Sequence, residues 1–398
     1  MQKSKMKAQD NNNNSNINSS RKKRRLQITA VLLIAAVTLL LSSFGNQVAI
    51  EQRVLVHAMG IDFDGSEYTV SLQVFKTQSM GSDTPLDVSQ SNIQTVTCQG
   101  KTVKEAIDDC QYQLGKEVFL GHLQLICFGK TVDFSNPEGL FSFAIKDKNV
   151  FLGVELCLSD TTAEELMNVQ LTRGTMSSEN FTQVIKMGVR NGITLECRLI
   201  DFLSCINSPQ YVAMPVLSVK NSEAGSAENS AAEQQEPLLE ISQTALVKNG
   251  RVQNDTLNRE EAAGSAWLMG KAKQFDMVTN IDGKDVDIKL SDDGKKITLE
   301  NENGRLIYKV KLTVLAHASK DIRSERLSDE ISKAVKAQLT ENITAAWNKT
   351  IIANETDIFG IWKQLRHKYP QGYLEYKDKL EEIWRSTDLE LAINCRVE

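Results

Sequence analysis

The sequence predicts an α+β body preceded by one transmembrane helix. A charge-free apolar segment lies near the N-terminus, and beyond it period-two alternation and helical stripes follow one another in no regular βαβ order. The composition, 41% hydrophobic and 24% charged, is ordinary for a globular protein, and the roughly 350 residues after the apolar segment are enough for two or three domains. We therefore expect mixed or antiparallel sheets flanked by helices.

Residues 1–25 are predicted to form a disordered, basic tail in the cytoplasm. They contain the polar run Asn11–Asn14 and the five basic residues Arg21–Arg25, but nothing that could begin a hydrophobic core. Basic residues directly before an apolar segment favour a cytoplasmic N-terminus and a C-terminal body on the other side of the membrane.

Residues 26–45 are predicted to be a transmembrane signal anchor that includes Leu26, Ile34 and Leu41. No charged residue occurs between Leu26 and Ile50, and at about 1.5 Å per residue such a helix can cross a hydrocarbon layer of about 30 Å. A cleaved signal peptide ending at Ser43-Phe44-Gly45 is an alternative that length alone does not separate from an anchor. A buried core helix is disfavoured by the basic flank and the terminal position.

Charge and cysteine content exclude several classes of partner. The net charge is −5 and no basic patch lies outside the tail, so we expect no nucleic-acid partner. The seven cysteines show no CxxC spacing, which predicts no disulfide framework and no disulfide-linked partner. Most are interpreted as small buried hydrophobic residues, although Cys197 and Cys205 could pair.

The region 46–219 is predicted to contain two α+β lobes. Thr102 and Glu105 form a capping box that begins a helix, and Thr161 or Thr162 caps a shorter one. The segment 118–128 is apolar and favours β structure, interrupted at Gly121-His122. An apolar run predicts a strand at 54–61, and an alternating run predicts its partner at 68–75, joined by a tight turn at Asp64-Gly65. Further strands are predicted at 93–98 and 151–158.

Residues 220–236 are rich in Ala, Ser, Glu and Gln without apolar periodicity, which predicts a linker and the main domain boundary. The region 237–398 is then a second α+β domain that begins with an antiparallel meander. Its predicted turns lie at Asn249-Gly250, Asp282-Gly283, Asp293-Gly294 and Asn303-Gly304, and the run 306–314 alternates.

Helices are predicted to follow the meander. Ser328 caps a long amphipathic helix, a second helix follows Asp357 and ends at Tyr369-Pro370, and a third contains Tyr373 and Trp384. The apolar stripe of the long helix consists of Ile331, Val335, Leu339, Ile343, Trp347 and Ile351. Alternation over 389–397 predicts a final strand that returns to the sheet.

The search for chemistry finds no catalytic, cofactor-binding or metal-binding constellation. Gly264 to Gly270-Lys271 resembles a phosphate loop, but it has one residue too many between the glycines and lacks the hydroxyl that would hold magnesium. The tryptophans of the C-terminal helices are interpreted as core residues rather than a ligand box. Of the four histidines only His122 is a candidate ligand or general base, against a structural histidine at the start of a buried strand.

Several motifs occur in a characteristic order along the chain: Gly60-Ile61-Asp62, Gly100-Lys101-Thr102-Val103, Val118 to Ile126, Ile200 to Leu203, Met214-Pro215-Val216, Thr244 to Gly250, Asp357 to Gly360 and Tyr369-Pro370. Their order and spacing resemble those of the spore germination protein C family, the GerAC-type subunit of nutrient germinant receptors. The residues that we regard as structural family motifs are Gly60, Asp62, Gly121, His122, Asp357 and Pro370.

The resemblance implies three α+β domains and a non-enzymatic subunit without a cofactor. It would lie on the outer face of the spore inner membrane and act with two integral membrane subunits, one of them permease-like, to trigger germination. Family members usually carry a lipidated cysteine after the apolar segment, whereas here the first cysteine is Cys98, so we expect the helix itself to be the anchor. The alternative is a tethered extracytoplasmic solute-binding protein or enzyme with a pocket near His122.

Overall fold

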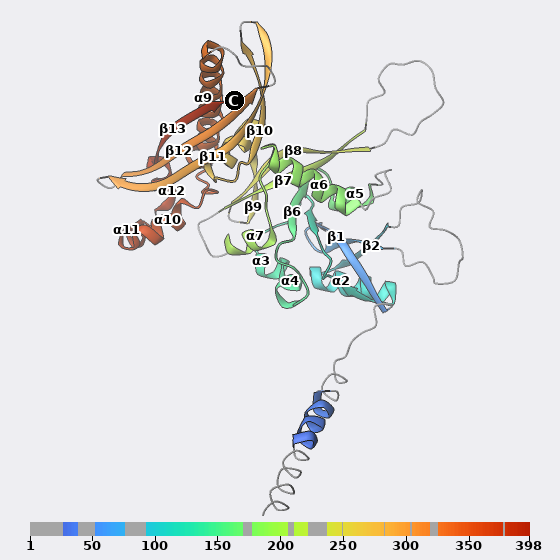
Figure 1. The fold of residues 1–398 in the computed structure, drawn as a ribbon. Coiled ribbons are helices and arrows are strands. Elements are labelled where there is room, and N and C mark those ends of the chain that lie inside the picture. The colour runs from blue at the N-terminus through green and yellow to red at the C-terminus, as the bar shows by residue number, and fades with distance from the viewer. Residues whose placement is uncertain are drawn as a thin grey trace, which may run out of the picture. The chain divides into compact units, whose positions relative to one another are not determined.

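The computed structural model describes residues 27–38, 52–75, 93–169, 177–205, 211–221, 237–248, 250–281, 283–302, 305–318, 325–376 and 379–398. Its internal contacts divide the chain into two units, Met1–Gln52 and Arg53–Glu398. The second unit contains all of the labelled strands and helices in Figure 1.

In the first unit, residues 27–38 form a helix whose apolar side chains are exposed. Ile34, from the predicted anchor, is 63% exposed, while Leu26 and Leu41 lie outside the described residues. Among the described residues, no helix is both long enough and apolar enough to span a bilayer. The transmembrane helix therefore stays a prediction.

The second unit contains two sheets, and the larger one is mixed. In the described part of the chain it has nine strands in the order β3-β2-β1-β5-β6-β7-β8-β9, with β4 paired to β1. The central strands β1, β5, β6 and β7 are parallel, and antiparallel strands extend the sheet on both sides. The bounds are β1 (Arg53–Phe63), β2 (Tyr68–Phe75), β3 (Ile93–Gly100), β4 (Glu117–Phe119), β5 (Leu125–Phe128), β6 (Glu155–Ser159), β7 (Val212–Asn221), β8 (Pro237–Lys248) and β9 (Arg251–Leu257).

Helices cover both faces of this sheet. Successive side chains of β5 point to opposite faces, so Ile126 and Phe128 enter one core while Leu125 and Cys127 enter the other. Burial on both sides explains why this strand is continuously apolar. The first core is closed by α2 (Val103–Leu114), α3 (Pro137–Leu140), α4 (Ser142–Lys146) and α7 (Leu199–Cys205), and the second by α5 (Ala163–Asn168) and α6 (Ser177–Arg190).

The larger sheet continues across the predicted linker. β7 and β8 are antiparallel neighbours from Val212↔Val247 to Asn221↔Pro237, so the connection that includes residues 222–236 joins two paired strands. The larger sheet therefore continues across 220–236, and the hydrophobic core of the smaller sheet also includes Leu195, Ala213 of β7 and Leu246 of β8. The domain boundary at 220–236 stays a prediction.

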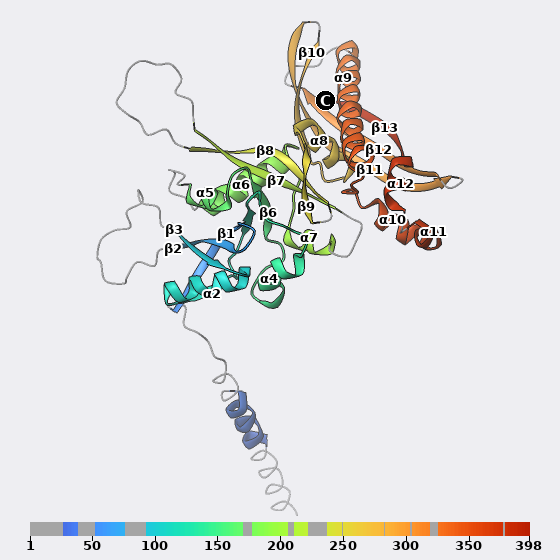
Figure 2. The same cartoon turned by 180° about the vertical axis from the view of Figure 1, so that it is seen from behind.

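The smaller sheet has the order β10-β11-β12-β13, with the closing strand parallel to β12. Figure 2 shows α8 and α9 packed beside this sheet. The bounds of this region are α8 (Arg259–Leu268), β10 (Gln274–Ile281), β11 (Lys284–Glu302), β12 (Arg305–Ala318), α9 (Glu325–Trp347), a π-helix over Asn348–Ala353, α10 (Ile361–Lys368), α11 (Pro370–Tyr376), α12 (Leu380–Ser386) and β13 (Asp388–Val397). The predicted stripe of the long helix is buried throughout.

Several predictions for this region differ from the structure. Ser328, the predicted cap of the long helix, lies inside α9, which already includes Glu325. Asp293-Gly294 is not a turn, because β11 runs through it with a register shift between Asp292 and Gly294. The predicted third helix is two short helices, α11 and α12, and Pro370 is the first residue of α11 rather than only the end of its predecessor. The helix α8 was not predicted, because its buried residues lie on all sides rather than along one stripe.

The structure also contains a disulfide bond that the sequence did not predict. Cys98 at the end of β3 and Cys110 in α2 are joined, with their Cα atoms 5.5 Å apart. The helix folds back onto the strand after Gly100, so two apolar positions 12 residues apart in sequence face each other. Cys197 and Cys205 are not joined to each other.

Candidate functional site

Gly60 and Asp62 clamp the helix α5 to the strand β1. The Asp62 carboxylate accepts hydrogen bonds from the backbone N–H groups of Ala163 at 2.8 Å and Glu164 at 2.9 Å. These are among the N–H groups that a helix leaves without internal partners at its first turn. A Cβ atom at Gly60 would lie 2.9 Å from Met167 Cγ and 3.1 Å from the carbonyl oxygen of Ala163, so a larger residue would require the neighbouring α5 atoms to shift. Both residues have a structural role.

His122, the candidate ligand or base, is exposed in the loop between β4 and β5. Its ring stacks on that of His57 with centroids 5.9 Å apart. A Cβ atom on the preceding Gly121 would lie 2.4 Å from the Phe119 ring. His122 does not line the groove described below.

The buried histidine of this pair is His57, which was not singled out in the sequence. It is 8% exposed, and neither ring nitrogen has a hydrogen-bond partner among the described residues. Burial lowers its pKa, and the neighbouring charge of His122 lowers it further. No described nucleophile or carboxylate forms a hydrogen bond with the His57 ring.

Asp357 organises the turn that begins α10. It is fully buried, and its Oδ1 accepts from the backbone N–H groups of Phe359 at 3.1 Å and Ile361 at 3.0 Å, while its Oδ2 accepts from that of Trp362 at 2.9 Å. Burial raises the pKa of this carboxyl to about 6, and hydrogen bonds from the backbone of the turn act in the opposite direction. Asp357 is thus a buried cap for the backbone N–H groups of this turn.

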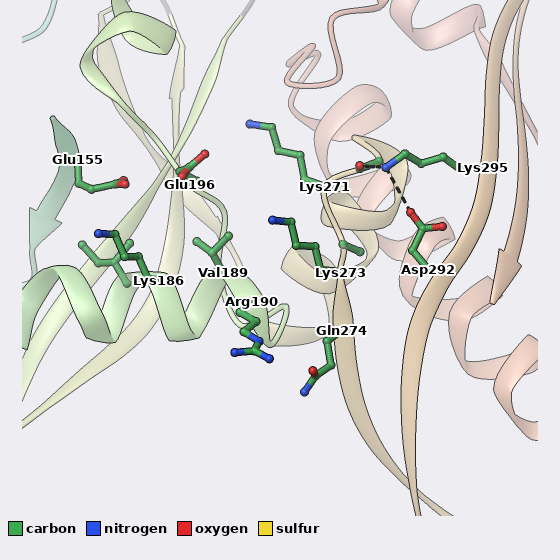
Figure 3. Close-up of a pocket in the computed structure, with 13 residues that line it drawn as sticks. Glu155, Lys186, Val189, Arg190, Glu196, Lys271, Lys273, Gln274, Asp292 and Lys295 are labelled. Atoms are coloured by element: carbon green, nitrogen blue, oxygen red, sulfur yellow. Dashed lines mark hydrogen bonds and ion pairs between the residues drawn. The ribbon is translucent and has the colours of Figure 1, made fainter. Parts of the chain in front are cut away.

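A charged groove lies between α6 and β6 on one wall and the segment 270–274 with β11 on the other. Its volume is about 990 Å³. Figure 3 shows Glu155 and Lys186 on one side, with Lys271 and Lys273 extending from the other side toward them. The charged residues that line it are Lys186, Arg190, Lys271, Lys273, Lys295, Glu155, Glu196 and Asp292.

Only part of this charge is compensated within the protein. Lys295 pairs with Asp292 at 3.4 Å and also contacts the carbonyl oxygen of Gly270, while Glu196 pairs with Arg198 at 3.6 Å. The other four cations of the lining make no ion pair with any described residue; they are Lys186, Arg190, Lys271 and Lys273. The groove therefore presents an excess of positive charge.

Glu155 is the buried carboxyl of the groove. It begins β6, is 6% exposed, and its Oε2 atom has no hydrogen-bond partner among the described residues. Burial raises its pKa to about 7, the charge of Glu196 adds to the effect, and Lys186 and Arg198 oppose it. A buried carboxyl without a donor is costly to the fold, which marks this position as a candidate binding site.

The sequence did not predict the groove, although one segment singled out in the sequence forms part of a groove wall. The segment from Gly264 to Gly270-Lys271, rejected as a phosphate loop, is the body and C-terminal end of α8, where Gly270 has a φ of 66°. Lys186 and Arg190 are four residues apart on α6, a spacing that places them on one helical face. The four-residue spacing of Lys186 and Arg190 was the sequence feature that could have indicated a basic surface here. Among the described residues, no group of three or more His, Cys, Asp or Glu is placed to hold a metal ion.

Comparison with known proteins assigns both halves of the body. Residues 46–219 match the family model described as the spore germination protein N-terminal domain, and residues 242–398 match the one described as spore germination B3/GerAC like, C-terminal. No curated protein sequence matches the chain.

A solved structure titled the crystal structure of the GerBC protein has a similar fold. The TM-score is 0.55 at 16% sequence identity, over 85% of this chain and 96% of the other. The two family models lie in order and together span most of the chain. This protein belongs to the GerAC family of spore germination proteins.

Proposed function

We propose that this protein is the non-enzymatic C subunit of a spore nutrient-germinant receptor. It assembles with two integral membrane subunits, one of them permease-like, at the spore inner membrane to trigger germination. The observation that carries the proposal is the consecutive match of both GerAC family domains. Two of the motif residues support a structural contribution to the fold, because Asp62 and Asp357 each accept hydrogen bonds from backbone N–H groups at the start of a helix.

Deleting the gene should abolish germination in response to at least one nutrient without lowering spore yield, and the wild-type gene should restore it. The fall in optical density of a spore suspension measures this. An affinity-tagged chain isolated from spore membranes should carry two multi-span proteins in a fixed ratio. Normal germination with every nutrient tested, together with isolation of the tagged chain alone, would contradict the proposal.

We further propose that residues 26–45 are a single-pass signal anchor with the body on the extracytoplasmic side. The exposed apolar helix over residues 27–38 and the five basic residues before it support this.

Ile34→Arg should move a large part of the protein from the membrane pellet to the soluble fraction, because an arginine at the centre of a span costs about 3 kcal/mol. Asn13→Arg adds the same charge in the tail and should change nothing. Cell fractionation with immunoblotting measures both, and a mature N-terminus at Asn46 would refute the anchor.

A further inference from the structure

We propose that the groove between α6 and the segment 270–274 binds an extended acidic segment of a partner polypeptide. The proposal goes beyond the receptor role and does not depend on it. Four features of the groove support it: uncompensated cations, their spacing, a buried acceptor without a donor, and its size.

The positive charge of the four cations without an ion pair among the described residues favours an anionic ligand. Lys186 and Arg190 lie on α6, and Figure 3 shows Lys271 and Lys273 extending toward that side from the opposite wall. The acidic side chains of the lining are either already paired, as are Glu196 and Asp292, or buried, as is Glu155. Like charges that converge in a partly enclosed groove repel one another, and an anion placed between them relieves this repulsion.

The spacing of the cations fits carboxylates on one face of an extended chain. Lys271 and Lys273 are exposed on either side of the buried Ala272, so they project on the same side two residues apart. Lys186 and Arg190, one helical turn apart, have Cβ atoms separated by roughly 5–6 Å. In an extended peptide, side chains at every second position repeat at about 6.6–6.8 Å on one face. Carboxylates two residues apart in a Glu-x-Glu segment therefore have a spacing close to that of the Lys271–Lys273 pair and of the Lys186–Arg190 pair.

The buried carboxyl of Glu155 favours a peptide over a simple anion as the ligand of the groove. Its Oε2 atom is buried in the groove without a donor, and its environment favours the protonated form near neutral pH only partly. A peptide backbone carries an N–H donor at every residue other than proline, whereas inorganic phosphate or a fully ionised carboxylate offers few or none. A peptide satisfies the acceptor and the cations together.

The size and the lining also favour a polypeptide segment. Pockets for small molecules have volumes of about 300–1,000 Å³ and are mostly apolar, with a few placed polar groups. This groove, at about 990 Å³, lies at the upper end of that range, and most of its lining side chains are charged. Acidic motifs are recognised on protein surfaces by clusters of this kind.

The test uses the full-length chain in detergent and a fluorescent, acetylated eight-residue peptide of alternating Ser and Glu, with binding followed by fluorescence anisotropy. The Glu peptide should bind at least 10-fold more tightly than the same peptide with Gln in place of Glu. The double variant Lys271→Ser, Lys273→Ser should lose at least 10-fold in affinity. The matched control is Lys146→Ser, Lys148→Ser, which removes the same charge at the same spacing outside the groove and should bind as the wild type does.

Unchanged thermal unfolding of both double variants confirms that they fold. Equal binding of the Glu and Gln peptides, or an equal loss in the two double variants, would overturn the proposal in favour of general charge attraction. Free glutamate should compete at least 10-fold more weakly than the peptide at the same carboxylate concentration. Competition as strong as that of the peptide would assign the groove to a small anion and would also overturn the proposal.

Discussion

Replacing Asp357 with alanine is expected to lower the free energy of unfolding by about 3–5 kcal/mol. The side chain is fully buried and accepts hydrogen bonds from three backbone N–H groups at the start of α10. Alanine leaves all three donors without a partner, and each buried, unsatisfied polar group costs about 1–3 kcal/mol. Part of this loss is offset, because the wild-type carboxylate is itself ionised at a buried site that raises its pKa to about 6.

Urea unfolding of the full-length chain in detergent measures the effect. Asp64→Ala is the matched control, because Asp64 accepts from the backbone N–H groups of Ser66 and Glu67 at 2.8 Å but lies in an exposed turn. Water can replace those bonds, so we expect a loss under about 1 kcal/mol. The loss of stability in Asp357→Asn should lie between the losses of the two alanine variants, because the Oδ1 atom of the asparagine keeps two of the three hydrogen bonds. A loss in Asp357→Ala no larger than in Asp64→Ala would show that the α10 amides find other partners.

Local chemistry made much of this fold predictable. The strand β2 has the predicted bounds, Thr102 caps α2 by accepting from the N–H of Glu105, and the closing strand β13 returns to its sheet. Each of these features depends on residues close together in sequence, because alternation and capping act over a few positions. The β12–β13 contact needed only the inference that a half-buried strand must find a partner.

Features that depend on distant contacts could not be predicted. The pairing of β7 with β8 follows from the register of two strands on either side of a polar segment, which composition cannot reveal. The helix α8 was missed because small residues let it approach α9 closely: a Cβ atom on Gly264 would lie 2.1 Å from the carbonyl oxygen of Asn342. The Cys98–Cys110 bond likewise required the fold to bring a strand and a helix together.

The candidate site shows the same division. Asp62 and Asp357 were recognised by the resemblance to a family, but their capping roles became visible only in three dimensions. The groove could not be predicted from the sequence because Lys186 and Lys273 belong to segments far apart in the chain, and neither segment carries a recognisable binding motif. Glu155 has no signal at all in sequence, since its burial is a property of the folded wall.

The folded environment of Glu155 is expected to make stability depend on pH. Its pKa is raised from 4.5 to about 7, chiefly by burial. Between these pH values the folded protein retains a proton that the unfolded chain has released, so the free energy of unfolding falls as pH rises and levels off above about pH 7. At about 1.4 kcal/mol per pKa unit, the fall attributable to Glu155 is about 3 kcal/mol.

Glu155→Gln removes this contribution because glutamine does not ionise. The variant and the wild type should have similar stability near pH 4, and the variant should be more stable by about 3 kcal/mol near pH 7.5. Urea unfolding at four pH values between these limits measures the difference between the two curves. That difference, rather than the wild-type curve alone, isolates Glu155, because Asp357 also ionises with a pKa of about 6 and contributes to both. Glu138→Gln, at an exposed position, should follow the wild-type curve. If Glu155→Gln also follows it, the carboxyl is solvated and the groove lacks the buried acceptor on which peptide binding depends.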